Sequence, residues 1–259
     1  MRAAVGVTMF VSFASSLCAS TPQWKVKPET ITYDVMYKWG LINKKAGSVA
    51  MTTSVDSRSD TFSALLTAAS APWADRFFMV RDTLMGTIDS HTYLPSYYEK
   101  ISHEGGAYSR DLLRFTHKDD VTRADATRWR RGKKAKEVSV SSAVHEAQGI
   151  TLDMLSSYYF MRRIDYAAMK PGQAVKMNIF SGKRKELLTI HYQGLDKVDI
   201  GGRKLDSYHI TFTFTTEGGK VSSDNMDAWI STTPSRIPLL LEGKLPVGKV
   251  RAVFSGTIQ

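Results

Sequence analysis

The chain has 259 residues, of which 42% are hydrophobic, and 35 Lys and Arg against 25 Asp and Glu give a formal net charge of +10. Its single cysteine, Cys18, lies in the N-terminal segment, so the rest of the chain can hold no disulfide, thiolate metal site or cysteine nucleophile. The length suffices for one large domain stabilised by its core alone.

The first twenty residues have the pattern of a secretory signal. Arg2 supplies a positive charge, a mostly apolar stretch follows, and small residues before Thr21 predict cleavage there. We expect residues 1–20 to be removed and residues 21–259 to form a single mainly β domain in the periplasm. That compartment excludes nucleic acid as the partner and favours a lipid, lipopolysaccharide or another anionic envelope component.

Alternating polar and apolar residues predict β-strands along most of the chain. Residues 30–39 and 47–55 alternate in this way, and in residues 209–216 every second side chain from 210 to 214 is Ile or Phe. Glycines separate such segments at the spacing of turns. We therefore predict a mainly β fold with a single large antiparallel sheet of about ten to fourteen strands, curved or barrel-like.

A strongly basic segment spans residues 128–136, with Gly132 expected at a hairpin tip. Arg and Lys side chains beside an indole suit contact with phosphate or carboxylate at a lipid or sugar surface. The alternative is a solvated hairpin whose charges prevent edge-to-edge sheet pairing. The candidates for contact with an anionic surface are Arg128, Trp129, Arg130, Arg131, Lys133 and Lys134.

One segment has helical instead of alternating spacing. Leu155, Tyr159 and Arg162 recur at the spacing of one helix face, Thr151 is the expected N-cap, and Asp153 falls in the first turn. The pattern predicts one helix near residues 151–163, packed against or plugging the curved sheet.

Several short motifs together resemble the exported bacterial "domain of unknown function 3108" proteins. The resemblance implies an all-β periplasmic or cell-envelope protein with a helix, and it brings no established activity and no catalytic residues. The motifs are residues 33–42 followed by Ala46-Gly47, Arg81-Asp82 ahead of Ile88-Asp89, Leu94-Pro95 before Tyr97-Tyr98-Glu99, residues 153–162, residues 229–238, and Gly248-x-Val250.

The aromatic residues are numerous enough to line a half-open barrel that holds an acyl chain, or else to fill its core. On the first interpretation the protein is a non-catalytic envelope protein that binds an amphiphilic or anionic component, by burial of a chain with Arg meeting a phosphate or carboxylate at the mouth. We expect Asp153, Arg162 and Arg81-Asp82 to form ion pairs. The candidate ligand-binding residues are Trp39, Tyr158, Tyr159, Arg162 and Trp229.

Two alternatives remain open: a scaffold whose sheet edges contact another envelope protein, and a hydrolase of envelope polymers. The six histidines are dispersed, and the sequence has neither an HExxH nor a GxSxG motif. We therefore predict no catalytic residues, no metal site and no cofactor.

Overall fold

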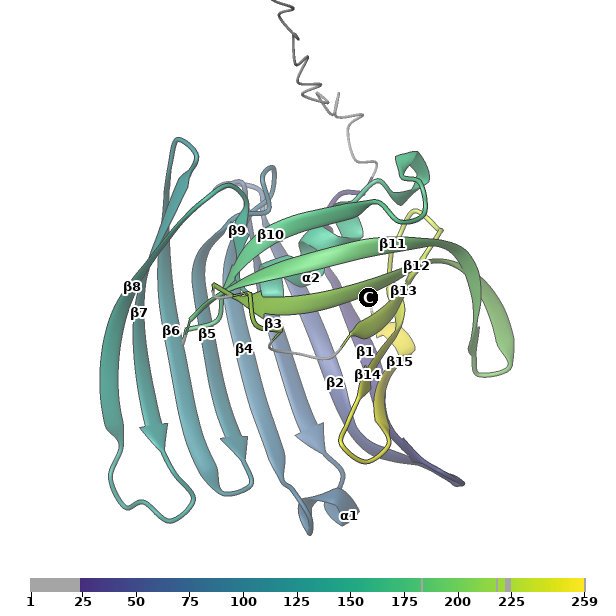
Figure 1. Cartoon of the computed structure of the whole chain (residues 1–259), viewed down its shortest axis with the longest axis horizontal. Helices are drawn as coiled ribbons and strands as arrows, with labels where there is room; N and C mark the ends of the chain where they lie inside the picture. Colours follow the sequence, from purple (N-terminus) through teal and green to yellow (C-terminus); the bar gives the residue numbers. More distant parts are fainter. Residues whose placement is uncertain (1–23, 183, 218, 222–224, 259) are drawn as a thin grey trace, which may run out of the picture.

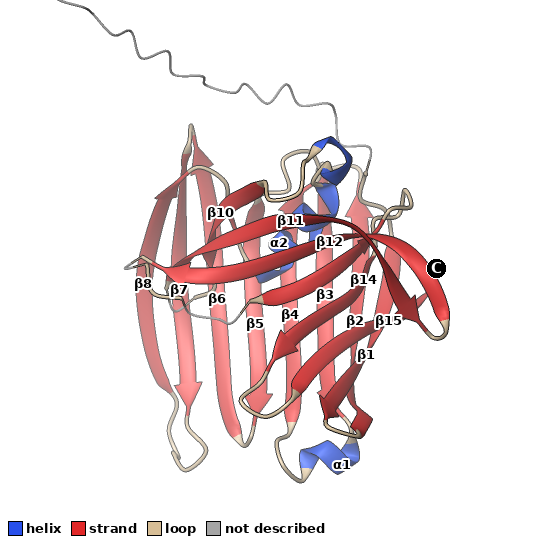
Figure 2. Ribbon diagram, turned by 45° about the vertical axis from the view of Figure 1, so that its right-hand side comes forward, coloured by secondary structure: helices blue, strands red, loops and turns tan. Residues whose placement is uncertain are grey.

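The computed structural model describes residues 24–182, 184–217, 219–221 and 225–258 (Figures 1 and 2). The expected signal over residues 1–20 lies outside the described residues. A single sheet forms the molecule, curled until it is nearly closed around an interior that contains one helix (Figure 2). This confirms the prediction of a mainly β, barrel-like fold.

The described part of the chain contains 15 strands in one sheet, slightly more than the ten to fourteen predicted. The strands are β1 (Glu29–Trp39), β2 (Ile42–Asp56), β3 (Thr61–Ser70), β4 (Val80–Asp89), β5 (Pro95–Glu104), β6 (Ala107–Lys118), β7 (Val121–Arg131), β8 (Ser139–Gln148), β9 (Thr151–Leu152), β10 (Ala174–Phe180), β11 (Lys185–Ile200), β12 (Arg203–Thr216), β13 (Met226–Ser231), β14 (Pro238–Lys244) and β15 (Lys249–Ile258).

The sheet follows the chain as a meander, with β8 at one edge and β9 at the other. The first and last strands, β1 and β15, pair antiparallel in the middle of this order, with Thr30 opposite Ile258. The short β9 pairs parallel with β10, because the helix between them carries the chain across.

A seam separates the two edge strands, which follow one another in the chain but form no ladder with each other. Individual hydrogen bonds bridge it. Asn178 Nδ2 donates to the Gln148 carbonyl of β8 at 2.8 Å, and Lys185 Nζ donates to the Glu146 carbonyl at 3.0 Å. The barrel-like sheet is therefore closed along this line by isolated contacts.

Side chains alternate between the interior and the outer face of the sheet, as the sequence pattern predicted. Phe62, Tyr98 and Leu113 point inward and are buried. Helix α2 (Met154–Arg163) packs against this interior face. Gly86 provides the space it needs, since a Cβ there would lie 3.3 Å from Leu155 Cδ1.

The helix begins later than the sequence analysis predicted. Asp153, not Thr151, is the N-cap: Asp153 Oδ1 accepts hydrogen bonds from the N–H groups of Leu155 and Ser156 at 2.6 and 2.9 Å. The Ser156 hydroxyl in turn accepts from the Asp153 N–H at 2.8 Å, which completes a capping box. Thr151 belongs instead to β9, where it pairs with Asn178.

Two further helical turns were not predicted. Helix α1 (Pro72–Asp75) connects β3 to β4 and starts with proline, whose fixed φ suits the first helical position. The 3₁₀ turn η1 (Tyr166–Ala168) follows α2. Four residues are too few to show a helical period, so α1 has no signature in the hydrophobic pattern.

Strands β11 and β12 form the longest hairpin of the sheet and extend beyond their neighbours (Figure 1). A bulge at Gly194 bends the hairpin. Val198 then packs with Leu239 and Leu240 of β14 in the smallest of three core clusters among the described residues.

Candidate ligand-binding site

One end of the barrel-like sheet, the end that carries α1, gathers five connections (Figure 1). We call it the lower end. The connections are the β1–β2 hairpin, the α1 segment between β3 and β4, the Gly105-Gly106 turn, the loop of residues 132–138 between β7 and β8, and the β14–β15 hairpin.

A cavity of about 830 Å³ opens at this end, and we call it the lower cavity. Its wall combines inward side chains of β1, β3 and β4 with the aromatic residues of the α1 segment. Trp39, one of the predicted ligand-binding residues, lies in this wall. The lining includes Val35, Tyr37, Trp39, Ala68, Ser70, Trp73, Phe77, Phe78, Val80 and Val250.

The cavity exists because small residues occupy the inward positions that large ones fill elsewhere. Gly47 pairs with Ser70, and Ala68 follows one inward position along β3, whereas Met51 and Leu66 pair and fill the interior nearer α2. Only glycine fits at position 47, since a Cβ there would lie 2.5 Å from the Ala69 backbone oxygen. The interior is therefore filled by side chains at the end that holds α2, and it contains a cavity at the lower end.

Among the described residues that line the lower cavity, Lys44 is the one with a charged side chain. Its Nζ lies 4.4 Å from the centroid of the Trp73 ring, a cation–π contact. Trp73 is fixed in turn, because its indole N–H donates to the Lys45 carbonyl at 2.7 Å. Lys44 forms no ion pair with any described residue, so its charge is available to a ligand.

A smaller hollow of about 280 Å³ adjoins the lower cavity and shares Phe78 with it. Arg130 and Arg131 of the predicted basic segment line this hollow, together with Ser102 and Glu104. The basic segment thus lies beside the lower cavity, although nothing in the sequence indicated that the two were neighbours.

Some cations of the basic segment form ion pairs and others do not. Arg128 and Arg130 both bind the buried Asp111 carboxylate, at 2.8 and 2.6 Å. Trp129 lies under the Arg110 guanidinium at 4.6 Å. The charges that remain free of ion pairs with described residues are those of Arg131, Lys133, Lys134 and Lys136, of which the three lysines are exposed.

Three of the other candidates lie together in the core at the opposite end. Tyr158 Oη is 2.8 Å from Tyr33 Oη, Tyr159 Oη is 2.7 Å from Thr53 Oγ1, and Arg162 Nη1 is 2.7 Å from Glu29 Oε1. The Arg162 side chain is 0% exposed, and its other amino group donates to the Ser235 carbonyl at 2.8 Å. These side chains hold α2 to β1 and β2 and do not line the lower cavity.

Of the four residues expected to form ion pairs, Arg162, Arg81 and Asp82 do so. Arg162 pairs with Glu29 and not with Asp153, Arg81 pairs with Asp75, and Lys100 lies 3.3 Å from Asp82. Asp153 has no cationic partner among the described residues, and its second oxygen, Oδ2, has no hydrogen bond there. Burial raises the pKa of this carboxyl to about 7, although the helix N–H groups lower it.

Trp229, the fifth candidate, lies on the outer face of the sheet beside the β11–β12 hairpin. Its ring stacks on His209 with centroids 4.6 Å apart, and its N–H donates to Asp196 Oδ2 at 2.8 Å. It contacts the small core cluster of Val198, Leu239 and Leu240 and is not among the residues that line the lower cavity.

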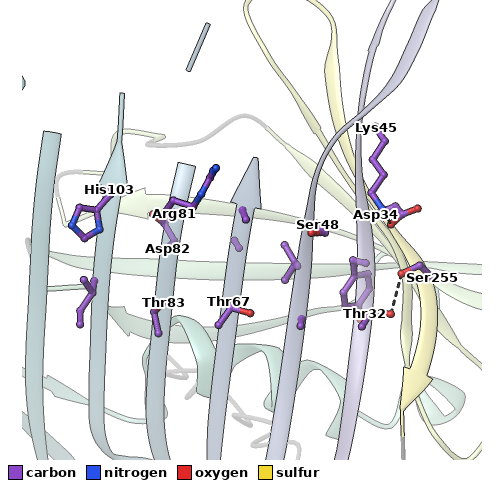
Figure 3. A pocket seen from close by; sticks show the side chains of 16 residues that line it. Thr32, Asp34, Lys45, Ser48, Thr67, Arg81, Asp82, Thr83, His103 and Ser255 are labelled. Carbon is purple, nitrogen blue, oxygen red and sulfur yellow. Dashed lines mark hydrogen bonds and ion pairs between the residues drawn. The ribbon is translucent and has the colours of Figure 1, made fainter. Parts of the chain in front are cut away.

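A second depression, of about 580 Å³, lies on the outer face over β1 to β5 (Figure 3). Small and hydroxyl side chains such as Ser48 and Thr67 form its floor. Its charged groups are already paired, since Lys45 Nζ is 2.6 Å from Asp34 and Arg81 binds Asp75. Among the described residues that line it, the depression therefore offers a ligand no Lys, Arg, Asp or Glu side chain that is free of an ion pair.

Among the described residues no group of three or more His, Cys, Asp or Glu side chains is arranged to hold a metal ion. No helix in the same part of the chain has the length and apolar character needed to cross a membrane.

Sequence reasoning found Trp39 but missed Lys44 and the role of the α1 segment. Trp73, Phe77 and Phe78 were visible as aromatic residues, but they follow a strand of unremarkable pattern. The signal that could have found them is Pro72, because a proline marks a break between strands. The three aromatic residues that follow it therefore fall in a connection and not in a strand.

Comparison with known proteins gives two findings. Residues 32–255 match the model of a family described as "Protein of unknown function (DUF3108)". A crystal structure of a beta-barrel-like protein of domain of unknown function DUF1849 from Brucella abortus superposes with a TM-score of 0.60 at 9% sequence identity, over 91% of this chain and 98% of that chain. That likeness concerns the fold alone. No curated protein matches the chain.

Proposed function

The chain belongs to the DUF3108 family, whose description assigns no activity, and from the lower cavity we propose that it binds an anionic amphiphile of the cell envelope without transforming it. The proposed setting is the periplasm, an expectation that rests on the sequence of residues 1–20. If it is right, N-terminal sequencing of the exported protein should begin at Thr21.

The observation that carries the proposal is an apolar cavity of about 830 Å³ whose described lining contains one lysine, Lys44, without an ion pair. Cavities of this size accommodate small ligands, and a few polar groups orient them. An acyl chain would lie along Val35, Ala68 and Val80, and each buried methylene would stabilise the complex by about 0.8 kcal/mol. A carboxylate or phosphate would meet Lys44, with Arg131 nearby in the adjoining hollow.

The first test measures binding of dodecanoate and dodecanol, which differ only in the charged group. Wild-type protein should bind dodecanoate more tightly, by native mass spectrometry and by competition with a fluorescent fatty acid. Lys44→Met should weaken dodecanoate binding about tenfold and leave dodecanol unchanged, because a charge-assisted bond contributes about 1.5–3 kcal/mol. Equal losses for both probes would contradict the role of Lys44.

The second test fills the cavity. Ala68→Trp should displace at least two methylenes of either probe, which lowers affinity about tenfold or more. Leu65→Trp is the matched control, because Leu65 is on the same strand but on the outer face, 39% exposed. Binding that survives Ala68→Trp, in a protein with an unchanged melting temperature, would show that the ligand does not enter the cavity.

A scaffold function is the second candidate, favoured by the free edge of the sheet. Strand β8 pairs only with β7 in the described structure, and Val140 and Val144 are exposed along it. A partner could add a strand there. In that case crosslinking from β8 should capture one defined envelope protein, and the lower cavity should remain empty in native mass spectra.

A further inference from the structure

We infer that the lower end of the molecule docks on the surface of an anionic lipid bilayer, so that the lower cavity opens toward the membrane. The inference deepens the proposed function, on which it rests for the nature of the cargo. It is carried by the exposed side chains around the mouth, of which Leu41 and Val247 do not line the cavity.

Large apolar side chains are exposed on three connections at this end, and we call them the apolar rim. In the described part of the chain, every exposed Trp or Phe side chain belongs to it. Phe77 is 83% exposed and Leu41 completely so. The rim consists of Trp39, Leu41 and Ile42 from the β1–β2 hairpin, Phe77 and Phe78 from the α1 segment, and Leu245 and Val247 from the β14–β15 hairpin.

Contacts between these connections make the rim one continuous surface. Tyr37 Oη donates to the Val247 carbonyl at 3.1 Å, which ties the two hairpins together. The Phe78 ring lies so close to Gly105 that a Cβ there would be 2.6 Å from it, and Lys133 packs beside Gly106. The apolar rim thus reaches from the β14–β15 hairpin to the basic loop.

Unpaired cations surround the rim. Lys38, Lys44, Arg76 and Lys244 are exposed and form no ion pair with any described residue. By contrast, the acidic groups Asp34, Asp75 and Glu242 at this end are neutralised by Lys45, Arg81 and Lys249 respectively. The loop of residues 132–138 adds Lys133, Lys134 and Lys136 against one acid, Glu137.

This combination identifies a lipid surface better than a protein one. Aromatic and aliphatic side chains at loop tips, encircled by lysines, suit the boundary between acyl chains and anionic headgroups. A second copy of the chain would bring two rings of like charge together, which repel each other. Five of the seven rim residues, all except Leu41 and Val247, also line the cavity, so a docked molecule offers an acyl chain a continuous apolar path.

The test is flotation with vesicles of phosphatidylcholine alone and of phosphatidylcholine mixed with phosphatidylglycerol. Full-length processed protein should float with the anionic vesicles, and added salt should weaken this binding. The double variant Leu41→Asp/Val247→Asp should lower the bound fraction at least about tenfold, because each change opposes insertion of a tip. Neither residue lines the cavity, so dodecanoate binding should be unchanged.

The matched control is Leu195→Asp, a change at an exposed leucine of the β11–β12 hairpin far from the rim. It should float like the wild type. Absence of flotation with anionic vesicles, equal flotation with both vesicle types, or equal loss in the control and the rim variant would each overturn the inference.

The two proposals fail separately. Protein that floats but binds no dodecanoate would refute the cavity ligand and leave membrane docking in place. Protein that binds dodecanoate but does not float would refute docking alone. Ala68→Trp, which narrows the cavity and leaves the rim intact, should lose dodecanoate and still float.

Discussion

The buried Arg162–Glu29 pair fixes the helix inside the sheet. Its two atoms are 2.7 Å apart, both side chains are almost fully buried, and the guanidinium also lies 4.3 Å from the centroid of the Trp24 ring. A pair of this kind stabilises a fold only while both members are present, because either charge alone would be left in an apolar environment.

Arg162→Met should therefore destabilise the protein by about 3–5 kcal/mol, since it strands the Glu29 carboxylate. The measurement is the free energy of unfolding in urea. Glu29→Gln/Arg162→Met is the control, and it should recover a substantial part of the loss because no charge remains buried. A single variant as stable as the wild type would contradict the structural role of the pair.

Asp153 should make stability depend on pH. Its carboxyl ionises near 3.8 in the unfolded chain and, with its pKa raised by burial, near 7 in the fold. Between these values the unfolded chain has released a proton that the folded protein retains, so the contribution of this group to stability should fall as pH rises from about 4 to about 7. Below and above this window its contribution is constant.

Thermal melting across this range measures the effect. Asp153→Asn keeps an N-cap, because asparagine caps helices about as well as aspartate, but it cannot ionise. The variant should lose this part of the pH dependence. If its profile parallels that of the wild type between pH 4 and pH 7, another group is responsible.

At the scale of residues, the sequence identified important side chains correctly more often than it identified their roles. Tyr158, Tyr159 and Arg162 stand out as polar groups on an apolar helix, but their partners lie more than a hundred positions away. Helical spacing cannot identify a partner at that separation. Lys44 is one of many lysines in the sequence, and only the fold shows that it faces a cavity.

Helix α2 fills the end of the interior opposite the lower cavity, so the packing of the core there depends on it. Leu155 is 0% exposed and faces Gly86, whereas Met154 beside it is 40% exposed. The helix therefore has one face that tolerates no charge and one that does.

Leu155→Asp should abolish cooperative unfolding or lower stability by several kcal/mol, because it buries an unpaired carboxylate. Met154→Asp is the matched control: its carboxylate is exposed and lies in the first helical turn, where the helix dipole favours it. Circular dichroism during thermal unfolding distinguishes them. Equal melting temperatures would show that α2 is not essential to the core.

Elements with a clear period could be predicted. The segments 30–39, 47–55 and 209–216 are indeed strands, within β1, β2 and β12. The start of α2 was misplaced by two residues because Thr151 and Asp153 are both good caps, and only strand pairing with β10 decides between them. Helix α1 was missed because one turn leaves no period to detect.

For the whole molecule, turn spacing predicted a large curved sheet but not its closure. The pairing of β1 with β15 joins residues more than two hundred positions apart, which local patterns cannot show. The lower end of the molecule likewise forms only when the sheet curls and β1 pairs with β15. Connections from both halves of the chain converge there, so neither the cavity nor the apolar rim exists in any single segment.

The meander order of the strands would allow the chain to be reconnected without loss of any strand pair. Strands β1 and β15 are hydrogen-bonded neighbours, and among the described strands the ladder is interrupted only between β8 and β9. A circular permutant that joins residue 258 to residue 24 by a short linker, with new termini at Gly149, would keep every strand pair. In that molecule the order of strands along the chain and their order in the sheet would coincide from one edge to the other.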